Sequence, residues 1–482
     1  MNKITKSYLG ISIAIIISTG LYFINPLSLG APAAKVLAIA ALIVTLWVTD
    51  AFPMPVVALL PIILFPLLNI APIEAAAAPY ADKIIFLFLG GFMLGLAIEK
   101  WNLHKRIALS IVKITGTSGN RIILGFILAT GLLSMWLSNT ATTMMMFPIA
   151  SSVILVMQQN HRGEGNIRYF SVCIMLAIAY SSNFGGIATI IGTPPNVAYV
   201  GQVQKYYGYS FSFADWMLLC LPLSILLLFT LYFLMVRILY PNKIKSSENT
   251  KALIEQELNQ LGKISSAEKR VLIVFCSTAF MWIFKDLLNK ILPVKLDDTI
   301  IALIAAISLF IVPSGIKDSS TFLLTWKDSN KMAWGILLLF GGGISLANQL
   351  EKAGLIGQLG RWIASYAGSN LLLLIFLIAL ISIFLSEVMS NVAQVIVFAP
   401  VVAGMADALH INPILLGMPM VLAASCASML PMGTPPNAIV FASGHLKLWD
   451  MIKTGFVMNI ICVILITLFC YFFIPLIIPS VP

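Results

Sequence analysis

The chain has 482 residues, of which 60% are hydrophobic and only 10% are charged, and its formal net charge is +10. A soluble protein of this size needs about 25% charged residues to cover its surface, so this composition and a mean hydropathy of +0.98 exclude a soluble globular protein. They predict an all-α membrane protein whose outer surface contacts lipid.

The excess of basic residues does not indicate nucleic-acid binding, because these residues lie in short loops between apolar runs. That distribution is typical of loops on the cytoplasmic side of a membrane. The cysteines and histidines form no CxxC, HExxH or other metal spacing, and neither a P-loop nor a GxGxxG motif occurs. We therefore expect no organic cofactor.

The first apolar run, Tyr8 to Ile24, follows Lys3 and Lys6. A cleaved signal peptide is one interpretation, since small residues follow the run. The run is long enough to cross a bilayer, however, and the rest of the chain is also apolar. Both points favour a transmembrane helix within an N-terminal segment, residues 1–33. The two lysines predict a cytoplasmic N-terminus.

A hydrocarbon core of about 30 Å needs about 20 apolar residues per helix. On that basis the sequence predicts about eleven membrane-spanning helices, at residues 8–28, 34–49, 53–71, 83–103, 169–200, 212–240, 269–289, 298–315, 332–353, 411–443 and 453–478. The prediction is thus a multi-pass protein of the cell membrane. An odd number of spans puts the C-terminus outside.

Two more apolar runs, 120–157 and 369–408, are too long for one span. Each is interrupted by a Ser-Asn pair, Ser138-Asn139 in the first and Ser390-Asn391 in the second. We expect both runs to be re-entrant hairpins, because that arrangement keeps the basic loops on one side of the membrane.

The two halves of the chain repeat. Ser134 and Ser138-Asn139 are matched 252 residues later by Ser386 and Ser390-Asn391, and the motif Gly-Thr-Pro-Pro-Asn occurs at 192–196 and at 433–437. An odd number of spans separates the halves, which inverts the second relative to the first. Inverted repeats with paired interruptions indicate a secondary transporter. The predicted boundaries are a first inverted repeat at 34–241, a cytoplasmic linker at 242–268 and a second inverted repeat at 269–482.

The Ser-Asn pairs suit the start of a half-helix, because Ser and Asn are good N-cap residues. A helix N-terminus attracts an anion, and an asparagine amide serves a cation with its oxygen and an anion with its nitrogen. In the second motif, glycine permits a turn and proline fits the first helical turn. A polar packing patch or a simple proline kink would explain one such motif. The matched pairs favour binding sites.

No lysine or arginine lies in any of the four interruptions. An anion bound there needs helix dipoles and a co-bound cation, which predicts coupling to Na⁺. Glu387 is the one acid beside an interruption. It is either a proton or cation group or a structural acid bonded to nearby backbone, and the structural interpretation is favoured because Met135 is its counterpart. The tryptophans, Trp216 among them, are expected in an interfacial belt.

At these motifs the chain resembles the divalent anion/sodium symporter family, whose members carry dicarboxylates, citrate or sulfate. The resemblance covers nearly the whole chain. It rests on Ser138-Asn139-Thr140-Ala141-Thr142-Thr143, on Ser386-Glu387-x-x-Ser390-Asn391 and on the two Gly-Thr-Pro-Pro-Asn motifs. It implies two Na⁺ sites, a central anion site, an elevator-type movement and a homodimer.

The resemblance also implies site residues by position. One Na⁺ would bind Ser134, Ser138, Asn139 and the Gly192 carbonyl, and the other would bind Ser386, Asn391 and the carbonyls of Met389 and Gly433. The anion would contact Asn139, Thr140, Thr193, Ser390, Asn391 and Thr434. The chain departs from the family pattern at Val392, where the full motif has threonine, so substrate identity is less well defined.

The function expected is Na⁺-coupled symport of a C4-dicarboxylate such as succinate, malate or fumarate. A Na⁺/sulfate symporter and a Na⁺-independent dicarboxylate exchanger are the alternatives within transport. An intramembrane enzyme would need a pair of aspartates or a His-Glu metal motif within the spans, and the sequence has neither. A channel would need a continuous polar stripe, which these spans lack.

Overall fold

The computed structural model describes residues 3–25, 29–49, 51–160, 166–244, 248–316, 322–358 and 370–478. Within these residues the chain is helical, and its β-structure is limited to one isolated bridge between Pro313 and Phe322. The predicted all-α membrane fold is therefore confirmed.

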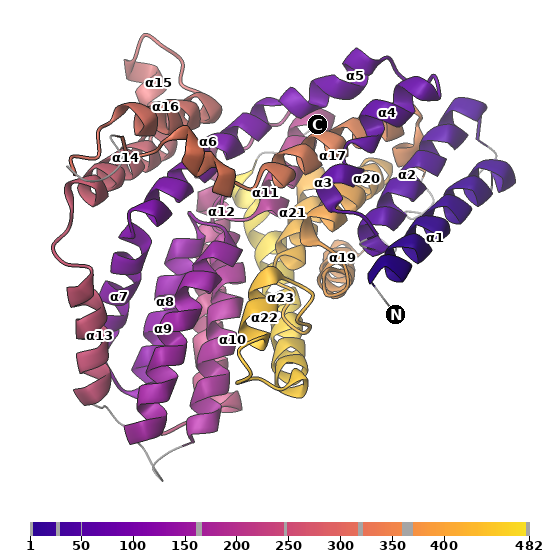
Figure 1. The fold of residues 1–482 in the computed structure, drawn as a ribbon. Helices are drawn as coiled ribbons and strands as arrows, with labels where there is room; N and C mark the ends of the chain where they lie inside the picture. The colour runs from indigo at the N-terminus through magenta and orange to yellow at the C-terminus, as the bar shows by residue number, and fades with distance from the viewer. Residues whose placement is uncertain are drawn as a thin grey trace.

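The first half of the chain contains most of the short helices (Figure 1). Its elements are α1 (Lys3–Ile24), α2 (Ala31–Thr49), α3 (Met54–Val57), α4 (Leu60–Leu67), α5 (Ile73–Ala77), η1 (Ala78–Ala81), α6 (Lys83–Lys100), α7 (Leu103–Thr115), α8 (Gly119–Ser134), α9 (Asn139–Asn160), α10 (Ile167–Gly186), α11 (Pro194–Tyr207), α12 (Phe213–Phe233) and η2 (Leu234–Leu239).

The second half of the chain follows from residue 248 onward. Its elements are α13 (Glu248–Gln260), α14 (Ser266–Ile283), α15 (Lys285–Ile291), α16 (Asp298–Ile311), η3 (Trp326–Lys331), α17 (Trp334–Lys352), α19 (Leu371–Ser386), α20 (Asn391–Leu409), α21 (Pro413–Ala424), α22 (Pro435–Phe441) and α23 (Leu448–Ile477).

Several helix boundaries differ from the sequence-based ones. The expected span at 53–71 is divided into α3 and α4, and the span at 269–289 bends by 79° between α14 and α15. Among the described residues, eight helices are long and apolar enough to cross a membrane, or nine if the bent pair counts as one span. The total of eleven spans and two re-entrant hairpins stays a prediction. The start of the second hairpin, residue 369, and the C-terminal residues 479–482 lie outside the described residues.

Basic residues are expected in short loops, but those that follow the expected span at 83–103 lie in an amphipathic helix, α7. It pairs with α13, which lies within the predicted linker, through Lys105–Glu257 at 2.9 Å and Lys113–Glu255 at 3.2 Å. A helix with one charged face and one apolar face suits the boundary between lipid and water. Of these two helices, α7 also packs against α8 and α13 against α9, so both lie along one side of the molecule (Figure 1).

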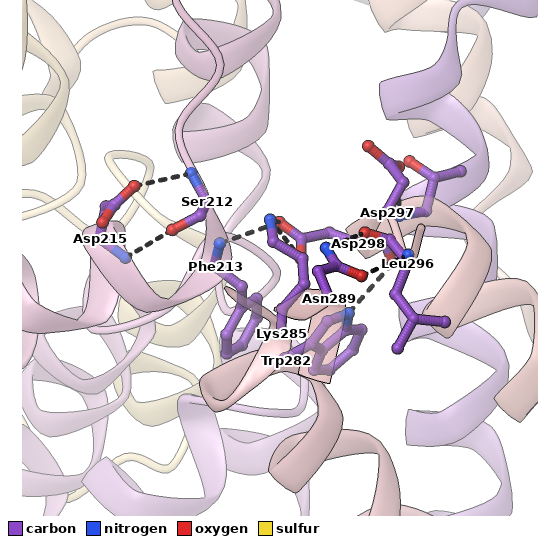
Figure 2. Close-up of polar contacts among 10 residues, drawn as sticks. Ser212, Phe213, Asp215, Trp282, Lys285, Asn289, Leu296, Asp297 and Asp298 are labelled. Atoms are coloured by element: carbon purple, nitrogen blue, oxygen red, sulfur yellow. Dashed lines mark hydrogen bonds and ion pairs between the residues drawn. The ribbon is translucent and has the colours of Figure 1, made fainter. Parts of the chain in front are cut away.

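The start of α12 is fixed to the start of α16 by a buried carboxylate, Asp298 (Figure 2). Asp298 accepts hydrogen bonds from the Phe213 backbone N–H at 3.0 Å and from Lys285 Nζ at 3.1 Å. Lys285 is the first residue after the bend between α14 and α15. The charge pair thus holds the bent segment of the second half against a helix N-terminus of the first half.

The two halves contact each other through the helices that follow the Pro-Pro motifs. Helix α11, from the first half, packs against α20 and α21 of the second, and α22, from the second half, packs against α9 and α10 of the first. Figure 1 shows α22 beside α10. Because α9, α11, α20 and α22 all begin at an interruption, this reciprocal packing brings the four interruptions toward one region of the molecule.

Candidate functional site

The first Ser-Asn turn joins the last residue of α8, Ser134, to the first residue of α9, Asn139. Ser134 Oγ donates to Asn139 Oδ1 at 2.7 Å and also lies 2.7 Å from the Ser182 carbonyl oxygen of α10. Ser138 caps α9, since its Oγ accepts from the Ala141 N–H at 3.2 Å. The turn therefore gathers a hydroxyl, an amide oxygen and a main-chain carbonyl.

The second Ser-Asn turn repeats this geometry between α19 and α20. Ser386 Oγ lies 2.6 Å from Asn391 Oδ1 and 2.6 Å from the Ala424 carbonyl oxygen of α21. Ser386 is buried and Asn391 is half-buried. Two turns that lie far apart in the sequence thus build the same oxygen cluster, with the same donor and the same kinds of acceptor.

These oxygen clusters suit a hard monovalent cation. A serine hydroxyl carries one proton, so Ser134 cannot donate fully to two oxygens at once, and one of the two close O···O contacts is left without a hydrogen. A cation among the three oxygens would relieve that repulsion. Neutral hydroxyl, amide and carbonyl oxygens at helix ends are the groups that coordinate Na⁺ in transporters built from broken helices.

Close glycine packing shapes the first cluster. A Cβ on Gly186, the last residue of α10, would collide with Asn139 Oδ1, and a Cβ on Gly192 would collide with the Gly186 carbonyl oxygen. Gly192 therefore lies against Gly186, which lies against Asn139. The structure brings three of the four residues expected at the first Na⁺ site, Ser134, Asn139 and Gly192, into this region, and Ser138 serves there as the cap.

The asparagine that ends each Pro-Pro motif stabilises the unwound backbone before it. Asn196 Nδ2 donates to the carbonyl oxygens of Gly186 at 3.2 Å and Thr189 at 2.8 Å. Asn437 Nδ2 donates to the carbonyl oxygens of Ala427 at 3.4 Å and Leu430 at 3.2 Å. Each acceptor in the second half lies 241 residues after its counterpart. The two breaks are therefore built alike, through residues that the motif analysis did not single out.

Glu387 neutralises the open backbone of the second break. Its carboxylate accepts from the N–H groups of Ser428 and Met429, both at 2.7 Å, from that of Leu430 at 2.8 Å and from Asn459 Nδ2 at 2.7 Å. The side chain is buried. Backbone N–H groups left by a broken helix attract a negative charge, and these contacts match the structural interpretation of Glu387.

The first break is stabilised by a hydroxyl, at a different backbone position from the carboxylate of the second. Thr189 Oγ1 donates to the Met135 carbonyl oxygen at 2.5 Å and accepts from the Gly192 N–H at 3.0 Å. Met135 is the counterpart of Glu387 in the repeat. In the second half the Glu387 carboxylate therefore lies beside Gly433, where a Cβ would approach Oε2 to 2.8 Å, and the first half has no acid at the equivalent position.

Asn183 connects the two halves at the site. Its Oδ1 accepts from Asn139 Nδ2 at 3.4 Å, and its Nδ2 donates to Thr434 Oγ1 at 3.2 Å. Neither Asn183 nor Ser182 is among the residues expected at the site from the sequence. The signal that would have found them is the polar run 181–183 inside an otherwise apolar helix.

The remaining expected residues lie on the same turns. Thr193 and Thr434 cap α11 and α22, and Thr434 Oγ1 accepts from the Asn437 N–H at 3.4 Å, whereas Thr193 forms no such bond. Three further residues of the expected ion and anion sites are half-buried on the Ser-Asn turns, namely Thr140, Met389 and Ser390. Their predicted contacts with an ion or an anion stay predictions.

One interfacial expectation was wrong close to the site. Trp216 is fully buried in α12, and its indole Nε1 donates to the Ile187 carbonyl oxygen at 3.0 Å. Ile187 is the residue after α10 ends. An indole that fills a buried position needs such a partner, and here the partner is a carbonyl freed by the break in the helix.

Sequence comparison finds relatives over nearly the whole chain. The family described as the sodium:sulfate symporter transmembrane region matches residues 5–478. The sodium-dependent dicarboxylate transporter SdcS of Staphylococcus saprophyticus is 39% identical over 445 residues, which cover 91% of this chain and 86% of that protein. SdcS of Staphylococcus aureus is 38% identical over 462 residues, which cover 95% of this chain and 89% of that protein.

Structure comparison finds transporters with a similar fold. The YdaH transporter of Alcanivorax borkumensis superposes with a TM-score of 0.60 at 12% identity, over 94% of this chain and 100% of that one. MtrF of Neisseria gonorrhoeae, described among antimetabolite efflux pumps, superposes with a TM-score of 0.56 at 13% identity, over 86% of this chain and 84% of that one. At these identities the likeness concerns the fold alone.

Proposed function

The chain belongs to the sodium:sulfate symporter family, as its motifs predict, and from this membership we propose that it is a secondary active transporter that couples Na⁺ entry to the uptake of a C4-dicarboxylate. Its curated relatives are named as sodium-dependent dicarboxylate transporters. Succinate, malate and fumarate are the substrates proposed.

The observation that carries this proposal is the duplicated oxygen cluster at the Ser-Asn turns. Each cluster combines a serine hydroxyl with an asparagine amide oxygen and a main-chain carbonyl, at distances of 2.6 to 2.7 Å. Two matching clusters support two Na⁺ sites. The first would use Ser134, Ser138, Asn139 and Gly192, and the second would use Ser386, Met389, Asn391 and Gly433.

The anion site is proposed between the clusters. Its groups are amides, hydroxyls and helix N-termini. Among the described residues their side chains form hydrogen bonds with serine, asparagine and main-chain groups, and none with lysine or arginine. A dianion bound without a fixed cation needs the two Na⁺ charges nearby, which is a physical reason for symport. The residues proposed to contact it are Asn139, Thr140, Thr193, Ser390, Asn391 and Thr434.

Alternating access is proposed to follow an elevator mechanism in a homodimer, with inverted repeats at 34–241 and 269–482 joined by a cytoplasmic linker. The reciprocal packing of α11 on α20 and of α22 on α9 supports movement of the four interruptions as one unit. The N-terminus would lie in the cytoplasm and the C-terminus outside.

A Na⁺/sulfate symporter and a Na⁺-independent dicarboxylate exchanger are the alternatives. A competition panel separates them: uptake of labelled succinate into proteoliposomes is measured with excess unlabelled malate, fumarate, citrate or sulfate. The proposal expects strong inhibition by malate and fumarate and weak inhibition by sulfate. Sulfate as the strongest competitor would replace the dicarboxylate assignment. Uptake that depends on internal dicarboxylate instead of Na⁺ would identify the exchanger.

A further inference from the structure

Asn183 occupies a position in the site that the expected ligand set does not include. It is 1% exposed near the end of α10, and it contacts Asn139 of the first half and Thr434 of the second. We infer that Asn183 is a positioning residue, an inference that rests on the proposed function. When Na⁺ occupies the first site, Asn183 orients the Thr434 hydroxyl that binds the anion.

The transmission starts at the Asn139 amide. Its Oδ1 faces Ser134 Oγ in the oxygen cluster, and its Nδ2 faces Asn183. The amide is planar, so a cation that holds Oδ1 also fixes the direction of Nδ2. With the cation bound, Nδ2 donates to Asn183 Oδ1. That bond sets the orientation of the Asn183 amide, because its oxygen must face Asn139 and its nitrogen must then face Thr434.

The transmission ends at the Thr434 hydroxyl. Thr434 Oγ1 accepts from Asn183 Nδ2 at 3.2 Å and from the Asn437 N–H at 3.4 Å. A hydroxyl oxygen has two acceptor positions and one proton. With both acceptor positions filled, the proton must point away from these two donors, where an anionic substrate can accept it. A hydrogen bond to a charged group is stronger than one between neutral groups.

The link exists on one side of the site alone, within the described residues. The offset of 241 residues at the break places Ala424, which has no polar side chain, opposite Asn183. The equivalent Ser134–Ser182 and Ser386–Ala424 contacts place the next residue, Ser425, there. Ser425 Oγ is buried without a hydrogen-bond partner, and Thr193, the counterpart of Thr434, has no side-chain bond at its cap. The first Na⁺ is thus coupled to the anion by a route that the second half lacks.

The consequence is a coupling between ion and anion affinity. Na⁺ at the first site lowers the half-saturating concentration of succinate, and succinate raises the affinity for Na⁺ by the same factor, because linkage is reciprocal. Coupled sites differ in affinity by about 5- to 150-fold between the two states. Loss of Asn183 should remove the part of this change in affinity that depends on the orientation of Thr434, and it should leave both binding sites in place.

The test measures the half-saturating succinate concentration at low and high Na⁺ in proteoliposomes. The variants are Asn183→Ala, Thr434→Val, the double variant and Ser425→Ala as the matched control. We expect the wild type and Ser425→Ala to improve in succinate affinity as Na⁺ rises. Asn183→Ala and Thr434→Val should each lose most of this improvement. The double variant should lose no more of the Na⁺-dependent improvement than Thr434→Val alone, because both residues belong to one series of hydrogen bonds.

Each outcome bears on a different claim. A wild type without any Na⁺ dependence contradicts the proposed function itself. A Na⁺-dependent wild type together with an Asn183→Ala variant of unchanged Na⁺ dependence overturns the role of Asn183. If Asn183→Ala does not fold, the pair Thr434→Val and Thr434→Ser decides, since serine keeps the hydroxyl. The link is supported if Thr434→Ser keeps the Na⁺ dependence of succinate affinity and Thr434→Val loses it. The link is overturned if the two variants show the same Na⁺ dependence.

Discussion

Ser134 Oγ donates to Asn139 Oδ1 at 2.7 Å across the first Ser-Asn turn. The contact joins the end of one half-helix to the start of the next, and the second half reproduces it at 2.6 Å between Ser386 and Asn391. The asparagine amide is thereby held with its oxygen toward a cluster of oxygens. The proposed Na⁺ sites depend on this orientation.

Replacing either asparagine should remove transport without preventing folding. Asn139→Ala and Asn391→Ala each delete an amide oxygen from one cluster, and both positions are half-buried, so little packing is lost. Changes in the groups around a metal lower its affinity by about 10- to 100-fold, and loss of a ligand should cost at least as much. Initial rates of succinate uptake, normalised to reconstituted protein, check this. Near-normal rates in either variant would remove that residue from the central site.

A methyl group at Gly186 should interfere with the first Na⁺ site. The Cβ of Gly186→Ala would meet Asn139 Oδ1, the oxygen assigned to the ion. We expect a higher Na⁺ requirement for succinate uptake, measured by titrating Na⁺. Gly20→Ala is the matched control, because a Cβ on this helical residue meets nothing within 4 Å, and alanine favours a helix over glycine. An unchanged Na⁺ requirement in Gly186→Ala would contradict the assignment.

Loss of the negative charge at Glu387 should destabilise the second break. In Glu387→Gln an N–H₂ group replaces one carboxylate oxygen. This group cannot accept a hydrogen bond, so a backbone N–H that faces it loses its partner. An unsatisfied buried donor costs about 1–3 kcal/mol, so the thermal unfolding temperature in detergent should fall. Met135→Leu, at the equivalent place in the first half, should be nearly neutral because it conserves volume. Equal unfolding temperatures for Glu387→Gln and the wild type would contradict the role of this carboxylate.

Val392 marks the difference between the two turns that are proposed to bind the anion. Thr140 supplies a hydroxyl in the first half, and Val392 stands at the equivalent position in the second. We expect Val392→Thr to change the relative affinities for succinate, citrate and sulfate in the competition panel. A hydrogen bond to a charged group is worth about 1.5–3 kcal/mol, or about 10- to 150-fold in affinity. An unchanged ranking and unchanged affinities would exclude position 392 from substrate selection.

The sequence predicted the interruptions well because each depends on local chemistry. Ser, Asn, Gly and Pro at fixed spacing define helix ends wherever the chain folds, and α9, α11, α20 and α22 all begin at the expected residues. The internal repeat also made the common geometry of the two Ser-Asn turns predictable, because the same residues at the same spacing form the same contacts.

Contacts between the halves could not be predicted in this way. Asn183 contacts Thr434 across 251 positions of sequence, and no local signal indicates such a partner. The amphipathic character of α7 and the burial of Trp216 were missed for a related reason. Composition alone does not distinguish an amphipathic helix from a basic loop, or a tryptophan at the lipid interface from one that packs under a broken helix.

The central claim is that Na⁺ drives dicarboxylate uptake through this protein. The most direct measurement is succinate accumulation in proteoliposomes of the purified chain with an inward Na⁺ gradient, compared with the same gradient of choline. The account predicts concentrative uptake that requires Na⁺ and collapses when the Na⁺ gradient is removed. Equal uptake with choline in place of Na⁺ would contradict it.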